Sequence, residues 1–427
     1  MLYESFHIAC LRSEAKTQAL SLLSLRYAIT RGMKVLGIET SCDETAVCVI
    51  EAGGDFPGRA GGPSFEFRVL GEGLTSQAAL HAQYGGVFPN LAKREHAKNL
   101  VPLLSKCLDE AGASNVRPTR SNIADLSRVL EREPELLQQL VPFLQTHEKP
   151  DIDVIAVTHG PGLEPCLWVG VNFAKALSAV WDVPIVGVNH MEGHVIMSLM
   201  QHSKVLQNVR MSDLEFPLLA LLISGGHTEL VLSREFGKYE LVGQTRDDAA
   251  GEAFDKVARL LELGYPGGPE ISRFAEAARK SDEVSPHRIS LPRPMMHEDN
   301  FDFSFSGLKT AVRRIVESNE ITDQLKHEIA REFEDAVADV LIAKTMRAVD
   351  EYGAQIVVVG GGVSANAEIR RRLDAELSTV DCKLLTPPVE FATDNALMIA
   401  LSGYFRALHK EFVEPENLNA VGNLKLA

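Results

Sequence analysis

The chain has 427 residues, 45% of them apolar and 24% charged, which excludes a disordered or fibrous protein and allows two domains. Its most apolar run, residues 216–223, is far too short to cross a bilayer. Its six cysteines are scattered without a CxxC pair, which argues against a thiolate zinc site or a disulfide framework and suits a reducing compartment. The formal net charge of -15 argues against a broad electrostatic grip on nucleic acid, so a polynucleotide substrate would need a local basic patch or partner proteins.

Residues 1–32 form an N-terminal extension with three open interpretations. Basic residues among serines and leucines weakly resemble an organelle transit peptide, but Glu4 and Glu14 argue against one. The extension could instead be disordered, or the true start could be Met33, where a regular pattern begins. Because the transit signal is poor, a cytoplasmic location is favoured, with mitochondria as the alternative.

Residues 35–50, VLGIETSCDETAVCVI, predict an apolar strand, a polar turn and a second, alternating strand. Carboxylates and hydroxyls gather at the tip of this unit, where Asp43 and Glu44 lie. A plain solvated hairpin turn would give the same pattern, so the segment alone does not decide between a site and a turn.

Three further segments belong to the first half of the chain. Several glycines and two prolines in residues 53–67 predict a long exposed loop, and residues 115–150 predict an added helical hairpin interrupted at Pro134. Between them, HAQYGGVFPNLAKREHAKNL leads into an amphipathic helix closed by Gly112. That helix carries a small basic cluster, which we interpret as a solvated face: Lys93, Arg94 and Lys98.

Two histidines in the segment VNHMEGHV predict a metal site. His190 and His194 are four residues apart, so on a helix both imidazoles project from one face and can bind a single ion. The alternative is a chance pair of surface histidines. Context favours the metal, because the strand-like run 184–188 ends just before the pair, and α/β proteins build their sites at the carboxyl ends of strands.

Residues 217–233, PLLALLISGGHTELVLS, repeat the pattern of strand, polar tip and alternating strand. Ser224, Gly225 and Gly226 offer a hydroxyl and close backbone approach at this tip. Two halves whose hairpin tips point into a shared cleft are typical of the actin-like ATPase superfamily, where the tips hold nucleotide phosphates. We therefore predict an α/β protein of two actin-like, RNase H-like domains with a nucleotide and metal cleft between them. His227 could be a ligand, but a histidine that only starts the return strand is favoured.

Polar residues downstream have competing roles. Asp247 or Asp248 is predicted to cap a helix. Asp255 within that helix is either an exposed carboxylate or an acceptor for ribose hydroxyls. Gly268 follows Pro266 and Gly267 in a turn where only small residues let a ligand lie against the backbone.

The last third of the chain predicts a long structural helix over residues 323–352 and a buried strand, IVVVGGG, that leads into a further helix. The glycines predict a cradle for a base or phosphate, with Asn366 placed to bond adenine or ribose, and a glycine-rich turn without a ligand is the alternative. N-capping explains Asp394, at a predicted helix start, unless the fold brings it to the histidines.

Ten motifs together carry a family resemblance. They resemble the threonylcarbamoyl-adenosine tRNA synthase family, once called glycoproteases, over residues 33–408. In chain order the motifs are IETSCDET, HAQYGG, HGPGL, NHMEGH, LISGGHTEL, DDAAGEAFDK, YPGGP, FDFSFSGLKT, GGGVSAN and FATDNA.

The resemblance implies transfer of a threonylcarbamoyl group from its adenylate to the exocyclic amine of the adenosine 3′ of the anticodon, in tRNAs that read codons beginning with A. His190, His194 and Asp394 match the family's metal ligands, with iron(II) favoured and zinc(II) possible. No nucleophilic serine or cysteine is required, and Asp43 or Glu44 is a candidate for the base. The positions that match the adenylate site are Leu222, Ile223, Ser224, Gly225, Gly226, Asp255, Gly268 and Asn366.

The implied domains are residues 33–187, with the insertion at 115–150, and residues 188–408, followed by a tail at 409–427. The extension, the loop at 53–67 and the insertion exceed the compact family pattern. Bacterial members of the family work with a paralogous partner subunit and a small ATPase, whereas organellar members resemble homodimers. An acidic protein that must hold tRNA fits a need for partners.

Two alternative functions remain. A metalloendopeptidase is suggested by HMEGH, but a zincin places its glutamate directly after the first histidine, where this chain has Met191. Glu192 is one residue further, about 100° around the helix. A nucleotide-gated actin-like scaffold is the other alternative, since it would need the cleft but not the metal ligands.

Overall fold

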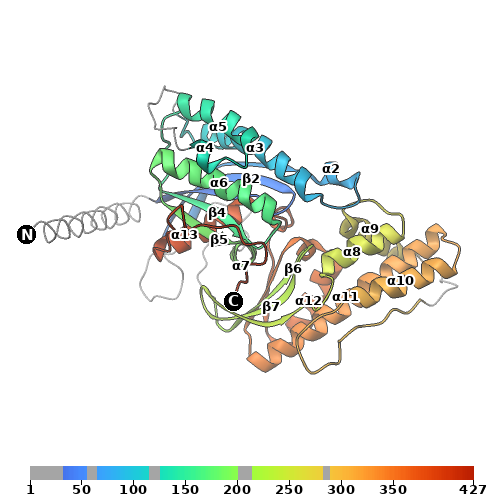
Figure 1. Ribbon diagram of the computed structural model, residues 1–427. Helices are drawn as coiled ribbons and strands as arrows, with labels where there is room; N and C mark the ends of the chain where they lie inside the picture. The colour runs from blue at the N-terminus through green and yellow to red at the C-terminus, as the bar shows by residue number, and fades with distance from the viewer. Residues whose placement is uncertain (1–31, 55–64, 115–125, 201–213, 282–288) are drawn as a thin grey trace, which may run out of the picture.

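The computed structural model describes residues 32–54, 65–114, 126–200, 214–281 and 289–427, which form two lobes, each built on a five-stranded sheet (Figure 1). Nearly all of the predicted extension lies outside the described residues, as do most of the loop predicted over 53–67 and the first part of the predicted insertion. Within the described ranges, no helix is both long and apolar enough to span a membrane.

The first sheet has the strand order β3-β2-β1-β4-β5. The first hairpin is confirmed, because β1 and β2 pair antiparallel on either side of residues 40–43, while β4 and β5 run parallel to β1. The strands are β1 (Met33–Glu39), β2 (Glu44–Gly53), β3 (Glu66–Ser76), β4 (Val154–Gly160) and β5 (Ile185–Asn189).

Helices on the first lobe follow the predicted patterns. The apolar face of the predicted amphipathic helix is buried against β2 and β3, as Leu100 and Leu104 show with no exposed surface. Pro134 begins a helix of the insertion, as its missing N–H allows. The helices are α2 (Ala78–Ala82), α3 (Pro89–Glu110), α4 (Leu126–Val129), α5 (Pro134–Thr146) and α6 (Glu164–Trp181).

The expectation of exposure at the end of the loop 53–67 is wrong. Phe65 and Phe67 are 1% and 3% exposed, and their rings stack with centroids 5.8 Å apart. Phe65 also contacts the rings of Tyr404 and Phe405. Aromatic burial, which a count of glycines and prolines does not register, decides this segment.

The second sheet has the order β10-β9-β6-β7-β8, which read from the other edge repeats the order of the first. In both sheets the first two strands of the repeat form an antiparallel hairpin and the fourth runs parallel to the first. This duplication is the topology of the predicted actin-like fold. The strands are β6 (Leu218–Ile223), β7 (Thr228–Glu235), β8 (Lys238–Gln244), β9 (Ile356–Gly360) and β10 (Lys383–Leu385).

The helices of the second lobe include the predicted long helix, confirmed as α11 (Asp323–Tyr352). The predicted N-cap role of Asp247 or Asp248 is wrong, because α8 is preceded by Ala249, and Thr228 Oγ1 accepts the N–H of Ala250. Asp247 accepts hydrogen bonds from segment 304–306 instead. The other helices are α8 (Ala250–Leu260), α9 (Gly267–Lys280), α10 (Ser306–Ser318) and α12 (Ala367–Leu377).

Helix α7 (His190–Leu199) lies at the junction between the lobes, and α13 (Ala396–Leu408) lies beside it on the first lobe. Helix α7 follows β5 directly and packs on β9 of the second sheet, while α13 packs on α7 and returns to β1 and β4 of the first. Their apolar residues belong to one buried cluster that includes residues of both sheets. Helix α7, which carries His190 and His194, therefore packs against both lobes.

The tail at 409–427 lies along the first lobe. Val421 N–H donates to His159 O at 2.8 Å, Gly162 N–H donates to Gly422 O at 3.0 Å, and Leu418 is 2% exposed. The tail also reaches the start of α7, where Asn189 Nδ2 donates to Lys425 O at 3.0 Å.

Close packing of α13 on the first sheet predicts the effect of Gly403→Ala. A Cβ on Gly403 would overlap the Cβ of Ala156 in β4. Overpacking of this kind costs about 1–3 kcal/mol, more than the gain of about 1 kcal/mol from better helix propensity. We expect a lower melting temperature by calorimetry. Gly307→Ala in α10 is the control, because its nearest atom would lie 3.8 Å away, and an unchanged melting temperature for Gly403→Ala would contradict the packing argument.

Candidate functional site

Helix α7 starts at the first histidine because Asn189 caps it. Asn189 Oδ1 accepts the N–H groups of Met191 at 2.9 Å and Glu192 at 3.4 Å, which satisfies donors at the helix start. The predicted helical spacing is confirmed, so His190 and His194 share one face of α7 at the carboxyl end of β5. Their side chains are 7% and 1% exposed.

Asp394 completes a cluster with the two histidines. Its Oδ1 atom lies 3.2 Å from Nε2 of His190 and 3.2 Å from Nε2 of His194. The interpretation of Asp394 as an N-cap is wrong, because Asn395 caps α13 through a 3.0 Å bond from Met398 N–H. The cap is one residue later, so the Asp394 carboxylate is free to face the histidines.

Glu39 is a site residue that the sequence analysis missed. It ends β1, has no exposed surface, and its Oε2 lies 3.1 Å from His190 Nδ1 and 2.6 Å from the Thr158 hydroxyl. A carboxylate on Nδ1 fixes the imidazole orientation and leaves Nε2 for a ligand. The available signal was a glutamate at the end of an otherwise apolar strand.

Charges within the cluster reinforce one another. Burial disfavours a charged His190, but the carboxylates of Asp394 and Glu39 outweigh it and hold the pKa of His190 well above its usual range. Burial lowers the pKa of His194. Burial acts to raise the pKa of Asp394, but the two histidines prevail and lower it. At neutral pH, His190 and Asp394 therefore form a buried ion pair.

The residues present fit a metal ion. One donor atom from each of His190, His194 and Asp394 can be chosen so that all three lie within 4.8 Å of one another. Two imidazole nitrogens and one carboxylate oxygen suit iron(II) or zinc(II) and leave coordination positions for a substrate. The buried carboxylate of Glu39 behind His190 is the outer partner that such ligands usually have.

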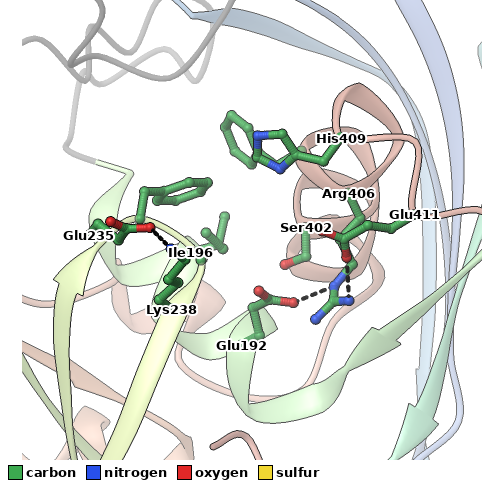
Figure 2. Close-up of a pocket in the computed structure, with 11 residues that line it drawn as sticks. Glu192, Ile196, Glu235, Lys238, Ser402, Arg406, His409 and Glu411 are labelled. Carbon is green, nitrogen blue, oxygen red and sulfur yellow. Dashed lines mark hydrogen bonds and ion pairs between the residues drawn. The ribbon is translucent and has the colours of Figure 1, made fainter.

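Glu192 of α7 faces Arg406 of α13, as Figure 2 shows. Its Oε2 accepts Arg406 Nε at 2.6 Å, and Arg406 also pairs with Glu411 at 2.9 Å. These groups line a separate cavity between α7, α13 and the β7–β8 turn. Glu192 pairs with Arg406 and lines this cavity, so it is not placed to activate a water at the histidines. This placement argues against a metalloendopeptidase.

The tip of the first hairpin approaches the same cluster. Asp43 O accepts the N–H of Gln77 at 2.9 Å, and Ser76 Oγ donates to Glu44 Oε1 at 3.2 Å. Burial, followed by the negative charges of Asp394 and Asp43, raises the pKa of Glu44 to about 9. In the absence of a cation, Glu44 is therefore protonated at neutral pH and can donate a hydrogen bond.

The tip of the second hairpin meets the cluster from the other lobe. A Cβ on Gly360 would lie 3.1 Å from the Cβ of His194, and one on Gly361 would lie 3.2 Å from the Cβ of Ser224, so the tip lies near the histidines. Burial, followed by the positive charges of the two histidines, lowers the pKa of His227 to about 4. The Ser224 hydroxyl accepts the N–H groups of Gly226 and His227, and both glycines of the tip are exposed. Two further predicted positions have side chains fully buried in the core, so only their backbone can face a ligand: Leu222 and Ile223.

The other predicted nucleotide positions lie on the second lobe. Asp255 Oδ1 accepts the N–H of Gly267 at 2.7 Å, and burial raises its pKa. A Cβ on Gly268 would meet no atom within 4 Å, so this backbone is open to a ligand. Asn366 caps α12 and donates to Ser272 Oγ at 2.9 Å and to Glu334. Both donors of its amide are thus used within the protein.

The fold and the site define the class of protein. Two RNase H-like lobes of the actin-like class bring two hairpin tips to a cluster of two histidines and one aspartate that could hold a metal ion. A model of the family described as tRNA N6-adenosine threonylcarbamoyltransferase matches residues 68–117 and 130–401. The chain belongs to this family, known as TsaD, and is therefore a transferase.

Relatives with that description match most of the chain. The protein of Ralstonia pickettii is 41% identical over 379 residues, which cover 88% of this chain and 91% of the relative. The protein of Chromobacterium violaceum is 40% identical over 388 residues, which cover 90% and 95%. A solved structure of full-length HypF, in a phosphate- and nucleotide-bound form, aligns at a TM-score of 0.47 and 13% identity over 92% of this chain and 56% of that one. That score is too low to add to the sheet topology.

The position of Glu39 predicts that Glu39→Gln weakens metal binding. The amide cannot stabilise the imidazole as the carboxylate does, and loss of such an outer partner costs about 10–100-fold in metal affinity. Titration with zinc(II) against a chromophoric chelator measures the change. Glu192→Gln is the matched control, because it alters another buried glutamate, one within α7 that faces Arg406. Equal zinc affinity in Glu39→Gln and the wild type would contradict the assigned role.

The raised pKa of His190 predicts that metal binding releases a proton. In protein stripped by a chelator, His190 is protonated at pH 7, and a ligand imidazole must be neutral. Titration calorimetry in two buffers of different ionisation enthalpy should show release of about one proton per ion.

Because the folded pKa exceeds the unfolded value of about 6.5, the stability from His190 is fully present below that pH and is lost as the pH rises through the folded pKa. Binding without proton release would refute the ion pair.

Proposed function

We propose that the enzyme transfers a threonylcarbamoyl group from threonylcarbamoyl adenylate to N6 of the adenosine 3′ of the anticodon, in tRNAs that read codons beginning with A. Membership of the transferase family supports the reaction type. The observation that carries the proposal is the convergence of both hairpin tips on the cluster of His190, His194 and Asp394.

The reaction is an acyl transfer that balances without an external oxidant or reductant. The N6 lone pair of adenosine attacks the carbamoyl carbonyl carbon, and a new C–N bond forms. The bond from that carbon to the phosphate oxygen breaks, and AMP leaves with the electron pair. N6 loses one proton, so the site must supply an acceptor for it.

The adenylate is proposed to lie against the second hairpin tip and α8. The backbone at Gly225 and Gly226 is exposed and can approach a phosphate. The carboxylate of Asp255 accepts the N–H of Gly267 and can also accept a hydrogen bond from a ribose hydroxyl. The backbone at Gly268 is open to a ligand beside it. Asn366 can reach a ligand only through its oxygen, because its amide donors are used.

His190, His194 and Asp394 are proposed to hold one divalent cation, with iron(II) favoured and zinc(II) possible. When bound, the cation supplies a Lewis acid that stabilises negative charge on the carbamoyl or phosphate oxygens. Glu39 orients His190 through its Nδ1 atom. The carboxylate oxygen of Asp394 contacts the Nε2 atoms of both histidines and so directs them to the same place.

Asp43 is proposed as the base that receives the N6 proton. Asp43 and Glu44 lie at the same tip, but the pKa of Glu44 is raised to about 9 by burial and by the carboxylates of Asp394 and Asp43. Without a cation, Glu44 is protonated at neutral pH and can donate a hydrogen bond, which favours Asp43 as the acceptor.

Partners and compartment follow from the family and the charge. With a net charge of -15, the protein is proposed to hold tRNA with the help of other subunits, a paralogous partner and a small ATPase in a bacterial setting, or a second copy of itself in an organelle. A cytoplasmic location is proposed, with mitochondria as the alternative. The domain division at 33–187 and 188–408 is likewise a proposal, although α13 packs on the first sheet.

The transferase proposal predicts metal-dependent formation of threonylcarbamoyladenosine. The wild type with its native metal, supplied with synthetic threonylcarbamoyl adenylate and an unmodified tRNA that reads a codon beginning with A, should yield the modified nucleoside by mass spectrometry. The variant His190→Ala, His194→Ala should lose at least about 100-fold in rate, because it has lost two metal ligands.

A tRNA that reads a codon beginning with another base is the control substrate. No product from the wild type, even with partner subunits present, would refute the transferase. A nucleotide-gated scaffold would then be preferred, and it would gain further if the histidine variant bound nucleotide and changed conformation as the wild type does.

A further inference from the structure

The loop that follows α2 displays two aromatic rings to solvent. Tyr84 is 62% exposed and Phe88 is 52% exposed, and they are the most exposed aromatic side chains among the described residues. Their ring centroids lie 6.1 Å apart with an interplanar angle of 29°. A single exposed aromatic side chain is common, but two that stack with each other form a platform that requires an explanation. We call this pair the aromatic platform.

Buried contacts hold the backbone beneath the aromatic platform. The ring of His81 is fully buried, where its Nε2 lies 3.1 Å from Gln77 Oε1 and its Nδ1 accepts the N–H of Phe88 at 3.2 Å. Gly85 and Gly86 have φ of 66° and 154°, which side chains other than glycine rarely adopt, and they reverse the chain between the two rings. The loop is thus organised from within, while its two rings remain outside.

The loop touches the second lobe beside the proposed adenylate site. Arg259 of α8 donates a hydrogen bond to Gly85 O, which joins the end of α2 to α8, as their places in Figure 1 indicate. Asp255 is one turn before Arg259 on the same helix, and the charges of Arg259 and Asp43 both act on its carboxylate. The aromatic platform therefore lies at the edge of the region where the transferred group and the target amine must meet.

We propose that the aromatic platform stacks an unpaired base of the tRNA anticodon loop next to the target adenosine. This inference rests on the proposed function, which requires that adenosine N6 leave the stack of the loop and enter the site. Single-stranded bases are commonly held on aromatic side chains, because every base has a π face. Stacking does not depend on the protein's net charge, which suits a chain with a charge of -15.

RNA fits this surface better than a protein partner does. A stable protein interface buries about 800 Å² on each side, whereas the apolar surface here is limited to two rings flanked by exposed Gln83 and Asn90. Arg94, exposed on the adjoining α3, and Arg259 add positive charge for phosphates near the loop. Two rings with nearby arginines match a short single-stranded segment of RNA.

The test uses full-length protein and an anticodon stem-loop with 2-aminopurine next to the target adenosine. Stacking quenches 2-aminopurine fluorescence, so the wild type should lower it on binding. The variant Tyr84→Ala, Phe88→Ala should bind the stem-loop about tenfold or more weakly and lose the quenching. Its affinities for zinc(II) and for the adenylate should match those of the wild type. Tyr84→Phe, Phe88→Tyr keeps both rings and should retain binding, and Val380→Ala is a control for loss of another exposed apolar side chain, 52% exposed.

The outcomes separate this inference from the proposed function. Equal affinity and equal quenching in the double alanine variant and the wild type would overturn the aromatic platform, even if the enzyme modifies tRNA. Quenching that depends on both rings, in an enzyme that forms no threonylcarbamoyladenosine, would support the platform and refute the proposed reaction. A double variant that loses only the binding of a protein subunit would also overturn the RNA platform.

Discussion

The structure depends on a buried network in which the imidazole of His190 bridges the carboxylates of Glu39 and Asp394. Asp394 Oδ1 lies 3.2 Å from His190 Nε2, and Glu39 Oε2 lies 3.1 Å from His190 Nδ1. Each carboxylate would be costly to bury alone, and the shared imidazole offsets part of that cost. Because the three residues come from β1, α7 and the segment before α13, this network requires three distant parts of the chain to be correctly placed.

The packing around α7 explains how that placement is kept. The helix starts where β5 ends, and Asn189 both caps it and donates to Lys425 O of the tail. Helix α13 packs on α7 and on the first sheet, where Gly37 and Gly403 allow the backbones to approach closely. The two lobes of the duplicated fold thus form one site, because each lobe supplies one hairpin tip and both lobes pack against α7.

The acidity of the chain and its chemistry are compatible for a local reason. The site concentrates carboxyl groups at Glu39, Asp43, Glu44 and Asp394. Those that are ionised suit a cation and a proton acceptor but repel the phosphates of a tRNA. Substrate contact must therefore use either partner subunits or interactions that do not rely on charge. Exposed rings held on a rigid loop belong to the second kind, and the same loop touches the helix that carries Asp255.

The sequence by itself determined the repeated hairpins, the long helix α11, the helical spacing of His190 and His194 and the family, because these depend on local periodicity and on long contiguous motifs. It named His190 and His194 by their helical spacing and Asp394 through the family resemblance, but residue patterns alone could not choose between a cap and a ligand for Asp394. Only the tertiary structure placed Glu39 behind His190, turned Glu192 toward Arg406, engaged both amide donors of Asn366 and raised the pKa of Glu44 by burial. Each of these facts depends on contacts between residues far apart in the chain, or on burial that the assembled lobes create, and neither leaves a periodic trace in the sequence.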